Sequence, residues 1–77
     1  MRGADMGQGA HLITHLTAER KARGLTQAQL AGAVGVSRKT INTIENRVFV
    51  PSTVLALKLA RELGVSVHDL FELGDEE

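Results

Sequence analysis

A link of three residues constrains this chain more than any other feature of its sequence. Residues 26–34 and 38–46 both carry apolar residues at helical spacing, and only Gly35, Val36 and Ser37 separate them. A link this short forces two helices to meet at a sharp angle and to pack closely against each other. The sequence therefore predicts two short helices joined by a tight glycine turn.

Helix-capping residues mark the ends of these two segments. Thr26 and Gln29 have the spacing of a capping box, which opens the first of the two helices. Gly35 can take the left-handed conformation that ends this helix, and Ser37 is a favourable N-cap for the next one. The boundaries of both helices are therefore predicted from local signals alone.

Three further helices are predicted around this pair. They are expected at residues 11–22, 51–64 and 66–74. Leu12, Ile13 and Leu16 give the first of them an apolar stripe, and Ser66 and Asp69 form a second capping box at the start of the last. Five short helices then account for nearly every residue after position 10.

The composition favours an all-α fold. The 77 residues include no cysteine, and two phenylalanines are the only aromatic residues in a chain that is 43% hydrophobic. The core must therefore be aliphatic, which suits packed helices better than a β-sandwich. We expect one domain at 11–74, preceded by a disordered lead at 1–10, native or left from cloning, and followed by an acidic tail at 75–77.

The formal net charge is zero, but it is unevenly distributed. Residues 1–50 hold seven Lys and Arg against three Asp and Glu, whereas residues 51–77 hold two against six. The basic residues between positions 20 and 47 are Arg20, Lys21, Arg23, Arg38, Lys39 and Arg47. This split predicts a basic working surface, although an ordinary solvated surface would give similar counts.

The helix predicted at 38–46 has two different faces. At 100° per residue, Ile41 and Ile44 fall on one side, with Glu45 at the border. The other side is a continuous polar arc of Arg38, Lys39, Asn42, Thr43 and Asn46. The arc contains no carboxylate, and its cations and amides suit the base edges of a DNA major groove. An ordinary solvent-exposed face remains the alternative for this helix taken alone.

The motifs "GLTQAQLA", "GVSRKTI", "IEN", "PS" and "LGVSVHDLF" occur in the order and spacing of a known family. Residues 12–73 closely resemble the Cro/C1-type (XRE) helix-turn-helix domains. The resemblance implies a five-helix, lambda-repressor-like fold. It also implies a transcriptional regulator, which we expect to be a repressor that binds double-stranded DNA as a homodimer on a short palindromic operator.

The resemblance assigns roles to residues of this chain by position. The candidates for reading bases are Arg38, Lys39, Asn42 and Thr43. The candidates for phosphate contact are Thr26, Gln27, Ser37, Thr40, Asn46 and Arg47. Arg20 and Glu45 match a pair that forms an internal salt bridge in the family, so Arg20 is expected to be structural.

The segment after the third helix departs from the family pattern. Many members have glycine where this chain has Arg47, so we expect the helix to end with Asn46 in the left-handed conformation. Val48, Phe49 and Val50 make the following loop unusually apolar. We expect this loop to fold onto the core, and the alternative is a loop that helps to pair two subunits.

The helix at 51–64 has an apolar arc of about 200°, wider than the ~100° that a surface helix needs. Central burial in its own monomer and partial burial against a second copy both explain such an arc. The candidates for a dimer interface are Phe49, Leu55, Leu57, Phe71 and Leu73. A two-fold pair would set the two recognition helices one DNA turn apart, about 34 Å.

Other classes of function find less support in the sequence. It has no cysteine nucleophile, no glycine-rich phosphate loop and no paired carboxylates. His11 and His15 have the i,i+4 spacing of two metal ligands, but no third ligand lies nearby. We therefore expect a protein that is not an enzyme and that has no metal or cofactor.

Partners other than DNA remain open. No apolar run approaches the ~20 residues that span a bilayer, and residues 1–10 lack the apolar core of a signal peptide, so we expect a cytoplasmic protein. The alternative to a repressor is an antitoxin-like protein, or a restriction–modification controller, with the same domain. Such a protein would use the apolar loop and the last helix to bind a protein partner.

Overall fold

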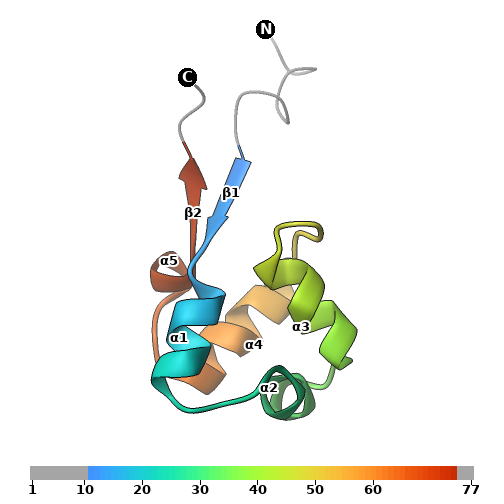
Figure 1. Ribbon diagram of the computed structural model, residues 1–77. Helices are drawn as coiled ribbons and strands as arrows, with labels where there is room; N and C mark the ends of the chain where they lie inside the picture. The colour runs from blue at the N-terminus through green and yellow to red at the C-terminus, as the bar shows by residue number, and fades with distance from the viewer. Residues whose placement is uncertain (1–10, 75–77) are drawn as a thin grey trace, which may run out of the picture.

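The computed structural model of the chain describes residues 11–74 (Figure 1). In chain order the elements are β1 (His11–Thr14), α1 (Leu16–Ala22), α2 (Gln27–Val34), α3 (Arg38–Glu45), α4 (Thr53–Leu63), α5 (Val67–Leu70) and β2 (Phe71–Gly74). The expected all-α, five-helix fold is confirmed for this part of the chain, with a two-stranded ladder added to it. The expectations for residues 1–10 and 75–77 lie outside the described residues.

The helix-turn-helix unit forms as the capping residues predict. The Thr26 hydroxyl accepts from the Gln29 amide at 3.0 Å, and the Gln29 side chain accepts in return from the Thr26 amide at 2.8 Å. Gly35 ends α2 with φ of 81°, in the left-handed region that favours glycine. The Ser37 hydroxyl then caps α3 by accepting from the Thr40 amide. These bonds satisfy backbone donors that a helix start leaves unpaired.

One aliphatic core joins the five helices. Its buried apolar residues are Leu16, Leu30, Ala31, Val34, Ile41, Ile44, Leu55, Leu59, Ala60, Leu63, Leu70 and Phe71. The helix α2 packs directly on both α3 and α4. No helix within residues 11–74 is long and apolar enough to cross a membrane.

The predictions for the two ends of the domain were wrong in part. The first helix begins at Leu16 rather than His11, and the last ends at Leu70 rather than Gly74. Residues 11–14 and 71–74 are instead strands that pair antiparallel, with Leu12 opposite Leu73. Pairing across the whole domain fixes an extended conformation that neither short segment specifies by its own pattern.

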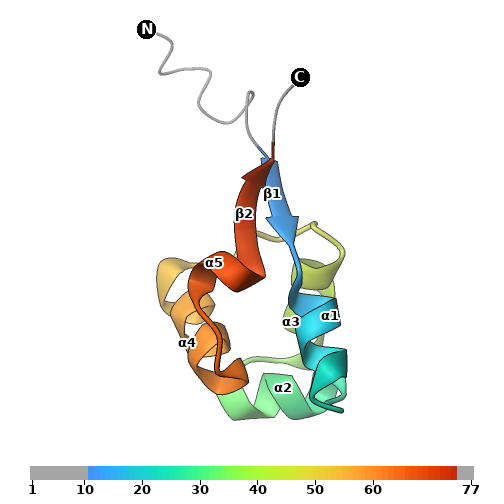
Figure 2. The same cartoon turned by 90° about the vertical axis from the view of Figure 1, so that its left-hand side faces the viewer.

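The ladder projects from the helical body. Figures 1 and 2 show it extending away from the end of the body that α2 occupies. A hydrogen bond of 2.8 Å from the His15 amide to the Leu70 carbonyl ties its base to the start of α1. Phe71 anchors β2 in the core, whereas Leu73 is 75% exposed. The ladder is therefore anchored in the core at Phe71, while the Leu73 side chain projects into solvent.

Candidate nucleic-acid interface

The two faces predicted for α3 are present in the structure. Ile41 and Ile44 are 0% and 1% exposed and hold the helix against the core. Arg38, Lys39 and Asn42 are exposed on the opposite side. The capped turn of the preceding residues fixes the direction of the helix, so these three side chains stand on a rigid support.

Glu45 is turned away from this face. Its carboxylate pairs with Arg20, with 2.7 Å between Arg20 Nε and Glu45 Oε2 and 3.1 Å between Arg20 Nη2 and Glu45 Oε1. The two side chains are 10% and 5% exposed, so the pair is internal. The only carboxylate of α3 is therefore absent from the exposed face, and no acidic side chain of this helix neutralises the positive charges there.

The surroundings of the pair fix the charge of both partners. Burial raises the pKa of the Glu45 carboxyl, but hydrogen bonds from Arg20 and Gln27 outweigh burial and hold that pKa below its usual value. The hydrogen bond to Glu45 raises the pKa of the Arg20 guanidinium. Arg20 also donates to the Leu25 carbonyl at 2.8 Å. Inside the domain, Arg20 thus links α1 to the start of α2 and to α3.

Gln27 takes part in this network, which sequence reasoning missed. Its Nε2 donates to Glu45 Oε1 at 2.9 Å, so one N–H of the side chain is used inside the protein. A second N–H and the amide oxygen of Gln27 have no hydrogen bond to other described residues. Gln27 is half-buried at the first turn of α2, where backbone N–H groups also point outward.

The polar residues of α3 are linked to one another. The Asn46 Nδ2 donates to Asn42 Oδ1 at 3.1 Å, and the i,i+4 spacing of these two asparagines was a signal available in the sequence. The Thr43 hydroxyl donates to the Thr40 carbonyl at 2.9 Å. The hydroxyls of Ser37 and Thr40 lie 3.1 Å apart. These bonds orient the side chains and leave the Asn42 amide N–H groups without a hydrogen bond to other described residues.

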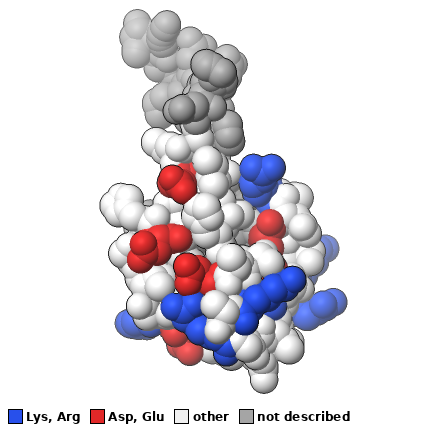
Figure 3. Space-filling view, turned by 60° about the vertical axis from the view of Figure 1, so that its left-hand side comes forward, with Lys and Arg blue, Asp and Glu red and all other residues white. Residues whose placement is uncertain are grey.

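The basic surface is smaller than the sequence count suggested. Arg23 Nε donates to the Leu63 carbonyl at 2.6 Å, and its Nη1 pairs with Glu19 at 2.7 Å. With Arg20 also internal, four of the six basic residues between positions 20 and 47 remain without an ion pair among the described residues. They are Lys21, Arg38, Lys39 and Arg47. Figure 3 shows most of the Lys and Arg side chains of this view on the lower part of the helical body, with Asp and Glu side chains among them and one basic side chain near the ladder.

The left-handed residue after α3 is Arg47, not Asn46. Asn46 has φ of −91°, whereas Arg47 has φ of 62° and is the only non-glycine residue of the described chain with positive φ. The Arg47 amide donates to the Ile44 carbonyl at 3.0 Å, which closes the helix one residue later than expected. An L-residue in this conformation costs roughly 1–2 kcal/mol, so the backbone here is strained.

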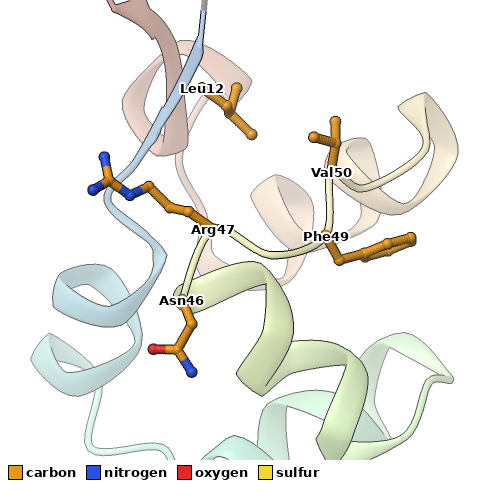
Figure 4. Close-up of a pocket in the computed structure, with 5 residues that line it drawn as sticks. All are labelled: Leu12, Asn46, Arg47, Phe49 and Val50. Carbon is orange, nitrogen blue, oxygen red and sulfur yellow. The ribbon is translucent and has the colours of Figure 1, made fainter.

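Arg47 borders a groove of about 640 Å³ beside the ladder. Figure 4 shows Leu12 and Val50 on its sides, Asn46 turned toward α3 and the Phe49 ring turned away from Leu12. Leu12 comes from β1, and the other lining residues come from the loop between α3 and α4. Arg47 thus lies on the boundary between the polar side chains of α3 and an apolar region.

The loop after Arg47 does not fold onto the core, so that prediction was wrong. Val48, Phe49 and Val50 are 77%, 45% and 67% exposed. The amides of Val48 and Phe49 donate to the Thr43 carbonyl at 2.9 and 3.2 Å, which turns the loop outward. Val48 and Phe49 also line a shallow groove with Lys39 and Thr43, so this part of the loop borders the polar face of α3.

The dimer candidates fall into two groups. Leu55 and Phe71 are 9% and 7% exposed and belong to the chain's own core. Leu57, Leu73 and Phe49 are 56%, 75% and 45% exposed. Most of the wide apolar arc of α4 is thus buried within the monomer, whereas its Leu57 edge is exposed.

The two histidines considered as metal ligands lie on different elements. His11 belongs to β1, whereas His15 precedes α1 and its Nε2 lies 2.5 Å from Glu72 Oε2. Within residues 11–74, no three histidine or carboxylate side chains are grouped so that they could hold a metal ion.

A helix with a cationic, carboxylate-free exposed face, on the outer side of a capped helix-turn-helix, is the recognition element of a DNA-binding regulator. Comparison with known proteins gives the same class. Residues 16–70 match the family described as "Helix-turn-helix", and the chain belongs to this family. Its relatives are transcriptional regulators, which is a non-enzymatic role, and the protein is therefore a regulator that binds double-stranded DNA.

Three relatives illustrate the likeness. An uncharacterized HTH-type transcriptional regulator of Methanocaldococcus jannaschii is 45% identical over 58 residues, which are 75% of this chain and 88% of that protein. The restriction-modification controller protein C.AhdI from Aeromonas hydrophila has a TM-score of 0.67 and 33% identity, over 70% of this chain and 82% of that one. SinR, the master regulator for biofilm formation solved in complex with DNA, has a TM-score of 0.65 and 31% identity, over 69% and 86%.

Proposed function

We propose that this protein is a repressor that acts as a homodimer on a short palindromic operator and inserts α3 into the major groove. One observation carries the proposal: α3 exposes Arg38, Lys39 and Asn42 with no carboxylate beside them, because Glu45 is buried against Arg20. A solvated helix face normally mixes charges of both signs, so this face is suited to a polyanion.

The chemistry of the exposed groups favours base reading. Arg38 and Lys39 can donate to the O6 and N7 of guanine, which are acceptors on the major-groove edge. The exposed amide of Asn42 can donate to N7 of adenine, and the Thr43 methyl can contact a thymine methyl. Asn42 Oδ1 already accepts from Asn46, and its second lone pair can accept from N6 of adenine in a bidentate contact.

Phosphate contacts would flank this face on both sides. Thr26 and the remaining groups of Gln27 lie at the N-terminus of α2, where backbone N–H groups attract an anion. On α3 and its ends, Ser37, Thr40 and Asn46 supply neutral donors, and Arg47 supplies a charge. Such contacts fix the register of the protein on the duplex without reading sequence.

A two-fold dimer explains how so small a domain binds tightly enough to regulate. One copy makes few phosphate contacts, and two copies double both the contacts and the salt dependence of binding. Recognition helices about 34 Å apart then read two half-sites one helical turn apart. The exposed Leu57, Leu73 and Phe49 supply apolar surface for the pairing.

Selection of duplexes from a random pool tests this proposal. We expect the full-length protein to enrich a two-fold symmetric site whose half-sites are centred about one turn apart. The affinity for that site should fall steeply with salt, because phosphate contacts release counterions. Enrichment of no common sequence, or binding that is insensitive to salt, would refute the proposed mode.

A restriction–modification controller or an antitoxin-like protein is the second candidate. The similarity to C.AhdI and the exposed loop of Val48, Phe49 and Val50 favour it. A protein of this kind shares the DNA-binding mode and differs in its regulated genes or in a protein partner. Affinity capture with the wild-type protein and with a Val48→Asp, Val50→Asp variant tests for a partner held by the loop. Such a partner would be retained by the wild type and not by the variant.

A further inference from the structure

The apolar side of the β1–β2 ladder forms a continuous surface with the start of α4. The cross-strand partners Leu12 and Leu73 share one face of the ladder, and Phe71 lies on the same face two residues before Leu73. Leu12 and Phe71 line a groove of about 210 Å³, whose opposite wall includes Val50 and Leu57. We call this the ladder groove. Leu73 stands at its rim and is 75% exposed.

The ladder lies outside the residues that match the family model. The match to the helix-turn-helix family spans residues 16–70, and the two strands lie immediately outside it at both ends. A two-stranded ladder of four residues a strand is marginally stable in water unless something packs against it. Its exposed leucine and open edges are therefore unusual for a surface that remains solvated.

We propose that the ladder is a dimerisation arm, and that Leu73 of each copy inserts into the ladder groove of the other. A projecting leucine and an apolar groove on one side of the same chain are self-complementary, as a two-fold interface requires. The groove is smaller than the roughly 300–1,000 Å³ of typical small-molecule sites, which favours a side chain as its occupant. The inference specifies how the dimer of the proposed function forms. It rests on that function only for the role of the dimer on DNA.

The exposed apolar area is sufficient for a small dimer interface. Val50, Val54, Leu57 and Leu73 are each more than half exposed, and Val54 neighbours Leu57 on one side of α4. At about 60–120 Å² for a large apolar side chain, these residues offer roughly 150–300 Å² a copy. The small interfaces of transient complexes bury less than about 600 Å² a copy, of which somewhat over half is apolar. This predicts a weak, reversible dimer.

The ladder lies away from the proposed DNA contacts at the N-terminus of α2 and on the polar side of α3, whereas Asn46 and Arg47 share a groove with Leu12 of β1. It extends from the end of the body opposite α2, so pairing through it leaves the N-terminus of α2 and the polar side of α3 uncovered (Figure 1). Pairing would place the two ladders between the two helical bodies. The arm therefore sets the spacing of the recognition helices as well as the strength of the dimer.

Sedimentation equilibrium of the full chain without DNA tests the arm. The wild type should dimerise between about 1 and 500 μM, and Leu73→Asp should raise the dissociation constant about 100-fold, because each dimer loses two buried leucines. Val48→Asp is the matched control, since Val48 is 77% exposed but does not line the groove. Its dimer should be unchanged. A wild type that stays monomeric at 500 μM, or a Leu73→Asp protein that dimerises like the wild type, overturns the inference.

Disulfide trapping tests the contact itself, because the chain has no cysteine of its own. Isotope-labelled Leu57→Cys protein mixed with unlabelled Leu73→Cys protein should form mixed disulfides under mild oxidation. Val48→Cys mixed with Leu73→Cys should form few. Equal yields in the two mixtures would place Leu73 outside the partner's groove.

The outcomes separate this inference from the proposed function. Leu73→Asp should keep its thermal unfolding midpoint, because Leu73 is largely exposed, and it should keep its base preference on a single half-site. A wild type that dimerises through Leu73 but selects no DNA sequence refutes the proposed function alone. If the wild type selects a palindrome but Leu73→Asp leaves the DNA-free dimer unchanged, only the dimerisation arm is refuted.

Discussion

The polar face of α3 and the apolar surface around the ladder groove are both exposed, but they are built in different ways. The polar face comes from one continuous stretch, and its supports, the capped turn and the buried Glu45, lie within residues 26–46 or contact them directly. The apolar surface combines residues near positions 12, 50–57 and 71–73. The first is complete in a single copy, whereas the second leaves large apolar side chains in water until a partner covers them.

This difference predicts that the polar face serves DNA binding and that the ladder groove serves dimerisation, which mutations can test. Changes on the polar face should alter DNA binding and base preference without changing the oligomeric state. Changes at the ladder groove should do the reverse. Changes to the supports should affect folding first.

Removal of the buried carboxylate should have the largest effect. Glu45→Ala leaves the Arg20 guanidinium buried without its partner and should destabilise the domain by about 3–5 kcal/mol. Urea unfolding followed by circular dichroism measures this loss. Glu62→Ala removes an exposed carboxylate from α4 and should change stability by less than about 0.5 kcal/mol. Similar losses in the two variants would mean that the internal pair does not support α3.

The same pair predicts a loss of stability in acid. The pKa of Glu45 is lowered in the folded state, so its contribution is fully present above the unfolded pKa of about 4.3. It is lost as the pH falls through the folded-state pKa, because protonation breaks the pair. Unfolding midpoints measured from pH 6 to pH 3 should fall, and Glu45→Gln should flatten part of the fall. Parallel curves for the two proteins would contradict this assignment.

Loss of one base-reading side chain should cost less and leave folding intact. Arg38→Ala should weaken operator binding by about 1–3 kcal/mol and relax the base preference at one position in each half-site. Arg61→Ala also removes one arginine charge, from the exposed side of α4, and should leave the base preference unchanged. Fluorescence anisotropy against the selected site and its single-base variants measures both. A uniform loss across all sequences would make Arg38 a phosphate contact.

The two serine caps allow a comparison between a helix on the proposed DNA face, α3, and a helix away from it, α5. Ser37→Ala and Ser66→Ala each remove a helix N-cap and should each cost about 1 kcal/mol of stability. Only Ser37→Ala should also weaken DNA binding, because Ser37 begins the recognition helix. Equal DNA affinities at a temperature where both variants are fully folded would remove Ser37 from the interface.

The smallest effect concerns Arg47, which lies at the boundary of the two surfaces. Arg47→Gly relieves its positive φ and should stabilise the domain by at most about 1 kcal/mol. It should also weaken DNA binding and lower the magnitude of the salt slope by about one for each copy bound. A stabilised variant with an unchanged slope would show that Arg47 does not meet phosphate.

The parts of the fold that local signals specify were predictable. Both ends of α2, the start of α3 and its two faces follow from Thr26, Gly35, Ser37 and the two isoleucines. The ladder was not predictable, because its strands are four residues long and pair residues about 60 positions apart in the sequence. Without their partner, residues 11–14 extend the apolar pattern of a helix.

The site was predictable in kind but not in detail. Spacing placed the polar arc on α3 and the resemblance supplied the Arg20–Glu45 pair, but the bond from Gln27 to Glu45 depends on how two helices meet. The exposure of Val48–Val50 and the burial of Leu55 and Phe71 depend on the ladder and the strained Arg47, which no local pattern revealed. The roles of individual residues toward bases and phosphates remain predictions.

The entry of α3 into the major groove is the central claim, and a double-mutant cycle tests it most directly. The two changes are Arg38→Ala and the replacement, by 7-deazaguanine, of the guanine whose preference Arg38 sets in the selected operator. The replacement removes the N7 acceptor from the major groove and leaves the minor groove intact. We predict that it weakens binding of the wild type by about 1–3 kcal/mol and has almost no effect on Arg38→Ala. Equal losses for the two proteins, or no loss for either, would contradict the proposed insertion of this helix.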